Sequence, residues 1–512
     1  MRSLTDSPRP FGTSITVAAV VAGCTTSSRR SDRGVDAAGS GCYRAGGGAG
    51  WHDGSVQHYD LVIIGSGSGN SIPDDRFADQ SIALVDSGTF GGTCLNVGCI
   101  PTKMFVHPAD LAHAPTESGR LGVDLELRKV HWAAVRDRIF GRIDPISDGG
   151  LRWRSSNPNV TVYTEDAHFV GEHALQVGEH TITADRFVLA AGSRPVLPEL
   201  PGLESVEFHT SDTVMRLPEL PASVVIIGGG YIAAEFSHIF SSFGSRVTVV
   251  SRGERLLARE DDDVSARFTE LIRQRVDLRT GVSASRVRPA EGGGVVLTLA
   301  AADGSEGEQE VRAEVLLVAT GRRPNSDRLD LDAVGVKVDD QGYVVVDDYQ
   351  RTSAPHVYAL GDVSSPYQLK HVANHEAKIV QHNLLHPDAP VESDHRFVPH
   401  AVFSSPQVAA VGLTEQQAVE QGLDVVTATQ AYGDVAYGWA MEDSQHFAKL
   451  VAERGTGRLL GAHLIGPEAS VLIQPLIQAM SFGQTASEVA RGQYWIHPAL
   501  TEVVENALLA LE

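Results

Sequence analysis

Two cysteines lie five positions apart in the segment GGTCLNVGCIPTK, residues 91–103. On an ideal α-helix, Cys94 and Cys99 would be separated by about 7.5 Å along the axis and about 140° around it. That separation exceeds the usual Cα distance across a disulfide, so a bond between them requires a distorted backbone. Neighbouring glycines, among them Gly98, permit the distortion. A distorted disulfide is reduced more easily than a relaxed one.

Three kinds of chemistry are open for this pair. A purely structural disulfide would gain little stability, because closing so short a loop removes little entropy from the unfolded chain. A metal site lacks support, since no second pair of cysteines or histidines lies at ligand spacing. Four cysteines in 512 residues are also too few for a disulfide-stabilised secreted scaffold. We therefore expect a working redox pair and no metal, with structural or free thiols as the alternative.

Two glycine-rich turns follow apolar segments of strand type, YDLVIIGSGSGN at 59–70 and SVVIIGGGYIAAE at 223–235. Such a turn brings backbone N–H groups close to a pyrophosphate, whose charge the following helix N-terminus favours. Each turn has a related segment further along the chain, FVLAAGSRPVLP at 187–198 and VLLVATGRRPN at 315–325. The repeat predicts two dinucleotide sites. Their expected contact residues are Gly65 and Gly67 in the first copy, and Gly228, Gly230 and Ala233 in the second.

The two sites are expected to bind different dinucleotides. Asp86 ends the strand after the first turn, where an acid accepts hydrogen bonds from an unphosphorylated adenosine ribose, as in FAD or NAD. In the second copy Ser251 takes the corresponding position and Arg252 comes directly after it. A guanidinium there suits a 2′-phosphate through its charge and paired hydrogen bonds. We therefore predict NADP(H) rather than NAD(H) at the second site.

Composition limits the classes of partner. The chain has 42 Lys and Arg against 64 Asp and Glu, a formal net charge of −22, which argues against nucleic acid and anionic membranes. No apolar run reaches the length of a membrane span, so small molecules are the expected ligands. The alternation of strands and helices predicts an α/β fold with two Rossmann-like dinucleotide-binding domains and an α+β C-terminal domain.

The N-terminal residues 1–57 are rich in Gly, Ser, Ala and Arg. We expect a disordered extension, or a stretch upstream of the true start. The segment SITVAAVVAGC at 14–24 resembles a lipoprotein signal, but we favour a cytoplasmic location. Cys24 and Cys42 lie in this stretch and receive no chemical role.

Five motifs together resemble the pyridine nucleotide–disulfide oxidoreductase family, in its glutathione reductase-like class: GGTCLNVGCIPTK, GGGYIAAE, ATGRRPN, YALGDV and HPALTE. The resemblance runs from about Tyr59 to the C-terminus. It implies a homodimeric enzyme that uses NADPH and FAD to reduce a small-molecule disulfide. The implied domains are FAD-binding at 58–205 and 331–395, NADPH-binding at 206–330 and dimerisation at 396–512. The segments GSGSGNSIP, SSPYQLKHVAN, DVAYGWAMED and QYWIHPALTE narrow the resemblance to the branch that reduces mycothione.

The resemblance also implies a role for each reactive residue. Cys99 would be the thiolate beside the flavin, and Cys94 the thiol that attacks the substrate disulfide. His497, reaching the site from the partner subunit and oriented by Glu502, would accept and return the proton.

Further residues would position the cofactors. Lys103 would pair with Glu235 near the flavin, and Tyr231 would cover the flavin until nicotinamide displaces it. Asp362 would bind the ribityl chain. The remaining expected cofactor contacts are Thr93, Gly192 and Gly321.

One departure from the family pattern concerns the substrate pocket. Asn70 stands where the first turn usually has its third glycine, and Pro73 falls inside the segment that normally forms the next helix. Proline is tolerated only in the first turn of a helix, so a short or irregular helix is expected. Because this helix contributes to the substrate pocket in the family, we expect a substrate other than glutathione disulfide.

Other classes remain as alternatives. Dihydrolipoyl dehydrogenases share the cysteines but generally use NAD and carry an acid at the position of Ser251. Mercuric reductases and the large thioredoxin reductases carry a terminal cysteine pair, which the ending ALLALE lacks. A glutathione reductase-like enzyme is a further alternative, and a non-catalytic flavin redox sensor is a remote one.

Overall fold

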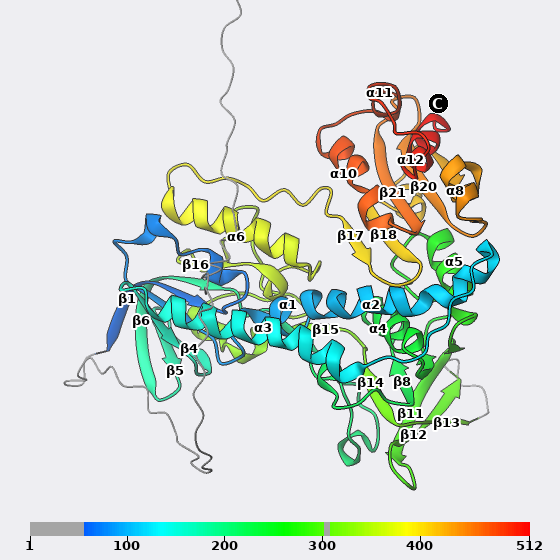
Figure 1. Ribbon diagram of the computed structural model, residues 1–512. Helices are drawn as coiled ribbons and strands as arrows, with labels where there is room; N and C mark the ends of the chain where they lie inside the picture. The colour runs from blue at the N-terminus through cyan, green and yellow to red at the C-terminus, as the bar shows by residue number, and fades with distance from the viewer. Residues whose placement is uncertain (1–55, 302–307) are drawn as a thin grey trace, which may run out of the picture. The chain divides into compact units, whose positions relative to one another are not determined.

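The computed structural model describes residues 56–301 and 308–512 (Figure 1). The expectations for the N-terminal extension, including its two cysteines and its lipoprotein-like segment, fall outside the described residues, and strand β1 begins at Gln57. Within the described residues, we find no helix with the length and apolar character needed to cross a membrane.

The first glycine turn belongs to a seven-stranded sheet of order β3-β2-β1-β6-β5-β4, with β16 beside β6. Strands β1, β2, β3, β6 and β16 run parallel, while β4 and β5 form antiparallel pairs. The bounds are β1 (Gln57–Ile64), β2 (Ile82–Val85), β3 (Val160–Tyr163), β4 (Ala167–Gly171), β5 (Ala174–Val177), β6 (His180–Leu189) and β16 (Val357–Ala359). Strand β16 comes after the strands of the second sheet in the sequence but pairs with β6 of the first. Two stretches that are distant in the sequence therefore build the first unit.

The second glycine turn belongs to a four-stranded parallel sheet of order β10-β9-β8-β14. A three-stranded antiparallel sheet, β11-β12-β13, is inserted before β14. The bounds are β8 (Ser223–Ile227), α4 (Tyr231–Ser242), β9 (Arg246–Val250), α5 (Asp262–Arg273), β10 (Asp277–Arg279), β11 (Val282–Pro289), β12 (Val295–Ala301), β13 (Gln309–Ala313) and β14 (Val315–Val318). Each glycine turn has a related segment later in the sequence, and these two segments contain β7 (Ser193–Pro195) and β15 (Arg322–Pro324). The two strands pair with each other in antiparallel orientation.

The C-terminal part is a five-stranded antiparallel sheet of order β17-β18-β21-β20-β19 covered by short helices (Figure 1). Its bounds are β17 (His400–Val402), β18 (Gln407–Gly412), α7 (Glu415–Glu420), β19 (Val425–Ala431), α8 (Ala436–Ala440), β20 (Phe447–Glu453), β21 (Leu459–Gly466), α9 (Ala469–Leu472), α10 (Gln474–Ser481), α11 (Ala486–Arg491) and α12 (Thr501–Leu509). Each of the first two large sheets has parallel strands at its glycine turn, and the C-terminal part has a separate antiparallel sheet, which together make the predicted α/β fold.

An aromatic core fixes the cysteine-bearing helices against the second unit. The remaining α-helices of the described residues are α1 (Gly92–Asn96), α2 (Cys99–Ser118), α3 (Trp132–Ser155) and α6 (Lys370–Leu385). Phe105 of α2 stacks near Trp132 of α3 with ring centroids 5.1 Å apart, and Trp132 lies 6.0 Å from Phe240 of α4. Burial of these rings holds α2 close to α4 and so sets the relative position of the two units.

No α-helix forms in the stretch between β1 and β2. Only two single 3₁₀ turns are present, Gly69–Ser71 and Asp75–Phe77, with Pro73 between them, which confirms the expected irregular segment. The guanidinium of Arg154, 3% exposed, donates to the side chain and carbonyl of Asn70 and to the carbonyl of Pro73. Burial lowers the pKa of Arg154, and its hydrogen bonds replace those that a helix would have made within itself.

Candidate active site

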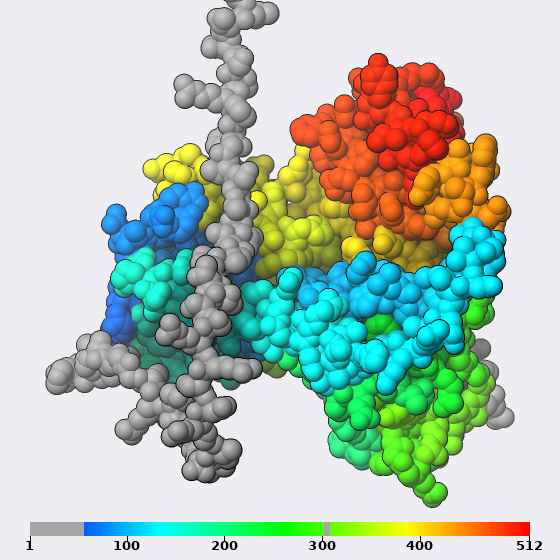
Figure 2. All heavy atoms as spheres, in the orientation of Figure 1, coloured from blue at the N-terminus to red at the C-terminus, as the bar shows by residue number. Residues whose placement is uncertain are grey.

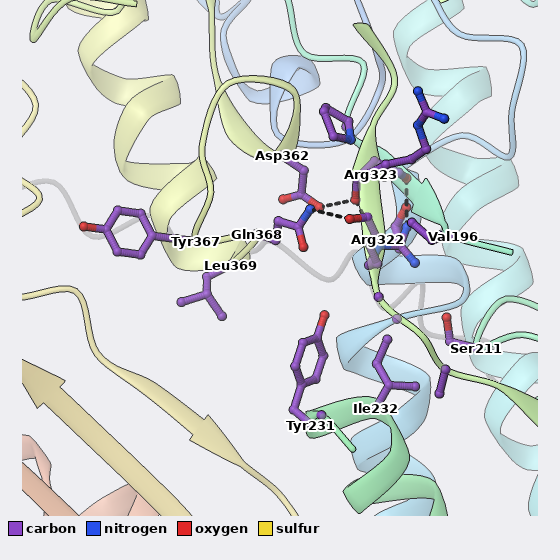
Figure 3. A pocket seen from close by; sticks show the side chains of 18 of the residues that line it. Val196, Ser211, Tyr231, Ile232, Arg322, Arg323, Asp362, Tyr367, Gln368 and Leu369 are labelled. Atoms are coloured by element: carbon purple, nitrogen blue, oxygen red, sulfur yellow. Dashed lines mark hydrogen bonds between the residues drawn. The ribbon is translucent and has the colours of Figure 1, made fainter. Parts of the chain in front are cut away.

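A cavity of about 2350 Å³ connects the two glycine turns. It is also lined by the cysteine segment and by strand β17, and by the loop that precedes α6, which includes Tyr367, Gln368 and Leu369 (Figure 3). Fifteen of the predicted site residues line it: Gly65, Gly67, Asp86, Thr93, Cys94, Cys99, Lys103, Gly192, Gly228, Gly230, Tyr231, Glu235, Arg252, Gly321 and Asp362. Ala233 does not line the cavity and is buried, at 1% exposure, and His497 and Glu502 lie elsewhere on the chain.

The two glycine turns have the same local geometry. Gly65 has a φ of +114°, and a Cβ there would lie 2.1 Å from the carbonyl oxygen of Ala190. Gly228 has a φ of +145°, and its Cβ would lie 2.2 Å from the carbonyl oxygen of Ala319. Each turn therefore passes directly against the backbone at the end of the neighbouring strand, which only glycine allows. Both turns leave their backbone open to the cavity, as dinucleotide binding requires.

Asp86 is positioned by the first turn. Its carboxylate accepts hydrogen bonds from the backbone N–H of Ser66 at 2.7 Å and from that of Gly88 at 2.8 Å. The hydroxyl of Ser66 donates to it as well. A carboxylate offers about four acceptor positions, so Asp86 retains capacity for a ribose hydroxyl at the edge of the cavity. The first turn and this acid fit the adenosine half of FAD.

In the second unit, Ser251 and Arg252 are directed differently. Ser251 is 6% exposed, and its hydroxyl packs beneath the turn, 2.6 Å from where a Cβ of Gly229 would stand. Arg252 is exposed, lines the cavity and forms no hydrogen bond or ion pair with any described residue. Sequence reasoning missed Arg255 and Arg259, which line the cavity from the same loop; the arginine-rich stretch SRGERLLARE was the available signal.

The cysteine segment has the distortion predicted from its spacing. Helix α1 ends at Asn96 and α2 begins at Cys99, so the chain breaks helical geometry between the two cysteines. At Gly98 a Cβ would lie 2.9 Å from the carbonyl oxygen of Thr93. Both thiols are free in this structure and share a hydrogen bond. The two residues are thus in contact as predicted, but the predicted disulfide is not formed here.

The two thiols differ in acidity. The hydrogen bond from Cys94 lowers the pKa of Cys99 to about 7; burial opposes this shift, and the charge of Lys103 reinforces it. The same hydrogen bond, together with burial, raises the pKa of Cys94. Cys99 is also the first residue of the 20-residue helix α2, where the helix dipole favours a thiolate. Cys99 therefore ionises first.

Lys103 and Glu235 form the pair that the resemblance implied. The Nζ of Lys103 lies 2.6 Å from Oε1 and 2.8 Å from Oε2 of Glu235, which is 4% exposed. The backbone N–H of Phe403 donates to the same carboxylate at 3.0 Å, and its ring lies 4.7 Å from the ammonium. This group connects α2, α4 and the end of β17 at the cavity wall.

Tyr231 and Asp362 face the same cavity from opposite sides (Figure 3). Tyr231 begins α4 and is 45% exposed, but this exposed surface faces the interior of the cavity, where desolvation of the phenol raises its pKa to about 12. Burial also raises the pKa of Asp362, although the hydroxyl of Ser193 donates to its carboxylate at 2.7 Å.

His497 and Glu502 are in contact at the far end of the chain. The Nδ1 of His497 lies 2.8 Å from Oε1 of Glu502, and the backbone N–H of Ala499 donates to Oε2. The His497 side chain is 71% exposed and is not part of the cavity that Cys94 and Cys99 line within the described residues.

Sequence reasoning missed two further features of the cavity. Lys370, the first residue of α6, lines it near the first turn. Glu260 also lines the cavity, and its Oε1 is 2.8 Å from Nε2 of His400. Burial of the imidazole acts to lower the pKa of His400, but the hydrogen bond and the charge of Glu260 outweigh it, so this pKa is raised. These contacts join segments that are far apart in sequence, so no local pattern indicated them.

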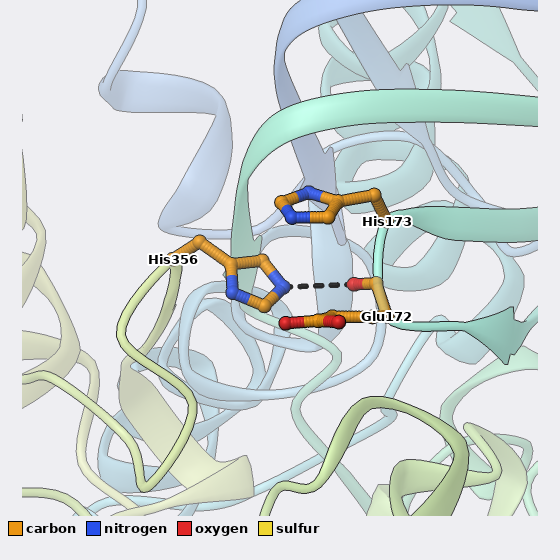
Figure 4. Close-up of side chains that lie close together, drawn as sticks. All are labelled: Glu172, His173 and His356. Carbon is orange, nitrogen blue, oxygen red and sulfur yellow. Dashed lines mark hydrogen bonds between the residues drawn. The ribbon is translucent and has the colours of Figure 1, made fainter.

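A group outside this cavity also has metal-ligand side chains. Glu172, His173 and His356 each offer one ligand atom within 4.8 Å of the others (Figure 4). The two imidazole rings are stacked, with their centroids 4.3 Å apart and an angle of 30° between their planes. Nε2 of His356 is hydrogen-bonded to the backbone carbonyl of Glu172. An imidazole lone pair lies in the ring plane, so stacked rings direct their lone pairs side by side rather than at a common ion. We assign no metal role to this group.

Comparisons with known proteins agree with this geometry. Residues 59–377 match the family described as pyridine nucleotide-disulphide oxidoreductase, and residues 398–508 match its dimerisation domain. Mycothione reductase of Mycobacterium tuberculosis is 55% identical over 469 residues, covering 89% of this chain and 100% of the relative. Mercuric reductase of Streptomyces lividans is 36% identical, covering 86% of this chain and 94% of the relative.

A solved structure shows the same fold. The HOCl-induced flavoprotein disulfide reductase of Escherichia coli superposes with a TM-score of 0.77 at 27% identity, over 89% of this chain and 100% of that one. The paired glycine turns, the cysteine pair between them and these matches have one explanation. The chain belongs to the pyridine nucleotide-disulphide oxidoreductase family and is a flavoprotein disulfide reductase in type.

Proposed function

We propose that this protein is an NADPH-dependent enzyme that reduces mycothione to mycothiol. The observation that carries the proposal is the hydrogen-bonded pair of Cys94 and Cys99 at the wall of the cavity that joins two dinucleotide turns. Bound FAD would pass two electrons from NADPH to the disulfide of this pair. Gly65, Gly67 and Asp86 would hold FAD, and Gly228, Gly230 and Arg252 would hold NADPH.

The reaction consumes one NADPH and one proton for each mycothione and releases two mycothiol molecules. Cys94, in the reduced pair, attacks one sulfur of mycothione; the substrate sulfur–sulfur bond breaks, and the first mycothiol leaves with a proton. The Cys99 thiolate then attacks the sulfur of Cys94. This step releases the second mycothiol as a thiolate, which takes up the one proton that the reaction consumes, and restores the Cys94–Cys99 disulfide for the next reduction.

The proton steps require a base that acts on the Cys94 thiol. We propose that His497 of the partner subunit supplies it, with Glu502 holding its ring. A homodimer is supported by the match to a dimerisation domain. It is also supported by large apolar side chains that are exposed on the C-terminal part of the chain, the part coloured orange to red by residue number in Figure 2. Those that are more than 60% exposed are Trp439, Val471, Phe482, Tyr494 and Ile496.

The preference for NADPH is supported by Arg252 and its lack of a partner among the described residues. Within the proposal, the FAD domain comprises 58–205 and 331–395, the NADPH domain 206–330 and the interface domain 396–512. We propose a cytoplasmic location, where NADPH is available.

One assay distinguishes the proposal from its rivals. NADPH and NADH oxidation would be measured with purified protein and mycothione, glutathione disulfide, lipoamide or mercuric ion as acceptor. We expect the highest kcat/KM with NADPH and mycothione. A preference for NADH with lipoamide would assign the chain to the dihydrolipoyl dehydrogenases. Reduction of the protein by NADPH without turnover of any acceptor would favour a redox sensor.

A further inference from the structure

The two glycine turns lead into different kinds of helix. The second turn leads into α4, a helix of 12 residues whose N-terminus lies at the cavity. The first leads only into the 3₁₀ turn Gly69–Ser71. The positive potential at a helix N-terminus comes from many aligned peptide dipoles, so a single turn supplies much less of it. The first site therefore lacks the usual charge compensation for a diphosphate.

Lys370 places a cation at this first turn from a distant part of the chain. Its Nζ lies 2.8 Å from the hydroxyl oxygen of Ser68, and that hydroxyl donates in turn to Oδ1 of Asn374 at 3.1 Å. Ser68 is 8% exposed and belongs to the glycine turn itself. Both Lys370 and Asn374 lie in the first turns of α6, so these contacts hold the start of α6 against the first glycine turn.

The ammonium of Lys370 is only partly satisfied by the described residues. It forms no ion pair with any described residue, and the hydroxyl of Ser68 uses only one of its three N–H donors. Burial lowers the pKa of Lys370, while Cys94, Cys99 and Asp362 are the charged or titratable groups that act in the opposite direction. A partly buried cation with two free donors is costly unless an anion accompanies it. The cavity wall at Ser68 is where that anion would bind.

We propose that Lys370 binds the diphosphate of FAD and takes the place of the absent helix N-terminus. The inference rests on the proposed function for the identity of the dinucleotide. Lys370 acts as a binding residue for the cofactor, and its hydrogen bond to Ser68 orients its remaining donors toward the turn.

The test measures the binding of FAD to the apoprotein, with the change in flavin fluorescence as the readout. Loss of a charge-assisted contact predicts that K370M binds FAD about 10- to 100-fold more weakly than wild type. K370R, which keeps the charge, should recover most of this loss. K378M removes an exposed lysine of the same helix and should bind FAD like wild type. The wild-type affinity should also fall with added salt more steeply than that of K370M.

The outcomes separate this inference from the proposed function. Failure of the wild-type apoprotein to bind FAD would contradict the proposed function itself. Equal FAD affinity of K370M and wild type at low salt would overturn the role of Lys370. If K370M keeps its FAD affinity and the pKa of the reduced thiols rises, the role is overturned as well, because the lysine then stabilises the thiolate of the Cys94–Cys99 pair instead of the diphosphate. Binding of 2′,5′-ADP to the second site checks folding and should be the same in all variants.

Discussion

The Nδ1 of His497 is hydrogen-bonded to Oε1 of Glu502 at 2.8 Å, while the His497 side chain remains 71% exposed. This hydrogen bond lowers the pKa of Glu502, so the carboxylate is the acceptor and Nδ1 carries the proton. In a neutral imidazole ring with this hydrogen bond, Nε2 is the nitrogen that has the lone pair. An imidazole held by Glu502 therefore lies on the C-terminal part of the chain, outside the cavity that the two cysteines line.

Replacing His497 separates the two half-reactions. H497A should lower the rate of mycothione reduction by about 10²- to 10⁴-fold, the usual contribution of a positioned acid–base group. Reduction of the bound flavin by NADPH should be unchanged, because it needs no proton from His497. Stopped-flow absorbance measures both steps, and H131A, at an exposed histidine, is the control. Equal losses in both half-reactions would contradict the proton-transfer role.

The thiol pair should titrate in two well-separated steps. In the reduced protein the first ionisation is expected at a pKa of about 7, since the hydrogen bond from Cys94 stabilises the Cys99 thiolate. The thiolate is lost as the pH falls below that value. C94A removes the donor and should raise the pKa of Cys99, and K103M should raise it as well. Ultraviolet thiolate absorbance against pH measures the shift, and an unchanged pKa in C94A would refute this account of the acidity.

Arg252 should decide the nucleotide preference. Hydrogen bonds to a charged group are worth about 1.5–3 kcal/mol, so R252E should raise KM for NADPH by at least about tenfold. KM for NADH should change little, because NADH has no 2′-phosphate. R286E, at an exposed arginine of β11, controls for the added negative charge. An unaltered NADPH to NADH ratio in R252E would exclude the 2′-phosphate contact.

Arg154 should stabilise the irregular segment after the first turn. Its buried guanidinium satisfies three acceptors on Asn70 and Pro73, and R154M leaves them without partners. We expect the free energy of unfolding to fall by on the order of 3 kcal/mol. Urea denaturation measures this change, with R152M as the control because Arg152 is exposed on the same helix. A loss no larger than that of R152M would show that the segment holds its shape without Arg154.

The parts that sequence reasoning predicted are those set by local chemistry. Gly65 and Gly228 stand where a Cβ would collide with a neighbouring strand, and this constraint leaves a readable pattern. Gly98 and the distorted cysteine segment could be predicted from spacing in the same way.

The contacts that sequence reasoning missed join distant segments. Lys370 reaches Ser68 across 302 positions, and Arg154 reaches Asn70 across 84. Pro73 indicated that the first helix would be irregular, but nothing local indicated which residues would replace it. Their identities depend on how α3 and α6 pack against the first sheet.

The most direct test of the central claim is the redox state of Cys94 and Cys99 before and after anaerobic addition of one NADPH per flavin. Thiols would be alkylated in denaturant and mapped by peptide mass spectrometry. We predict that both cysteines are blocked as one disulfide in the oxidised protein and that both become alkylated after NADPH. If NADPH bleaches the flavin while Cys94 and Cys99 remain unmodified, electrons do not reach this pair, and the proposed reductase mechanism is wrong.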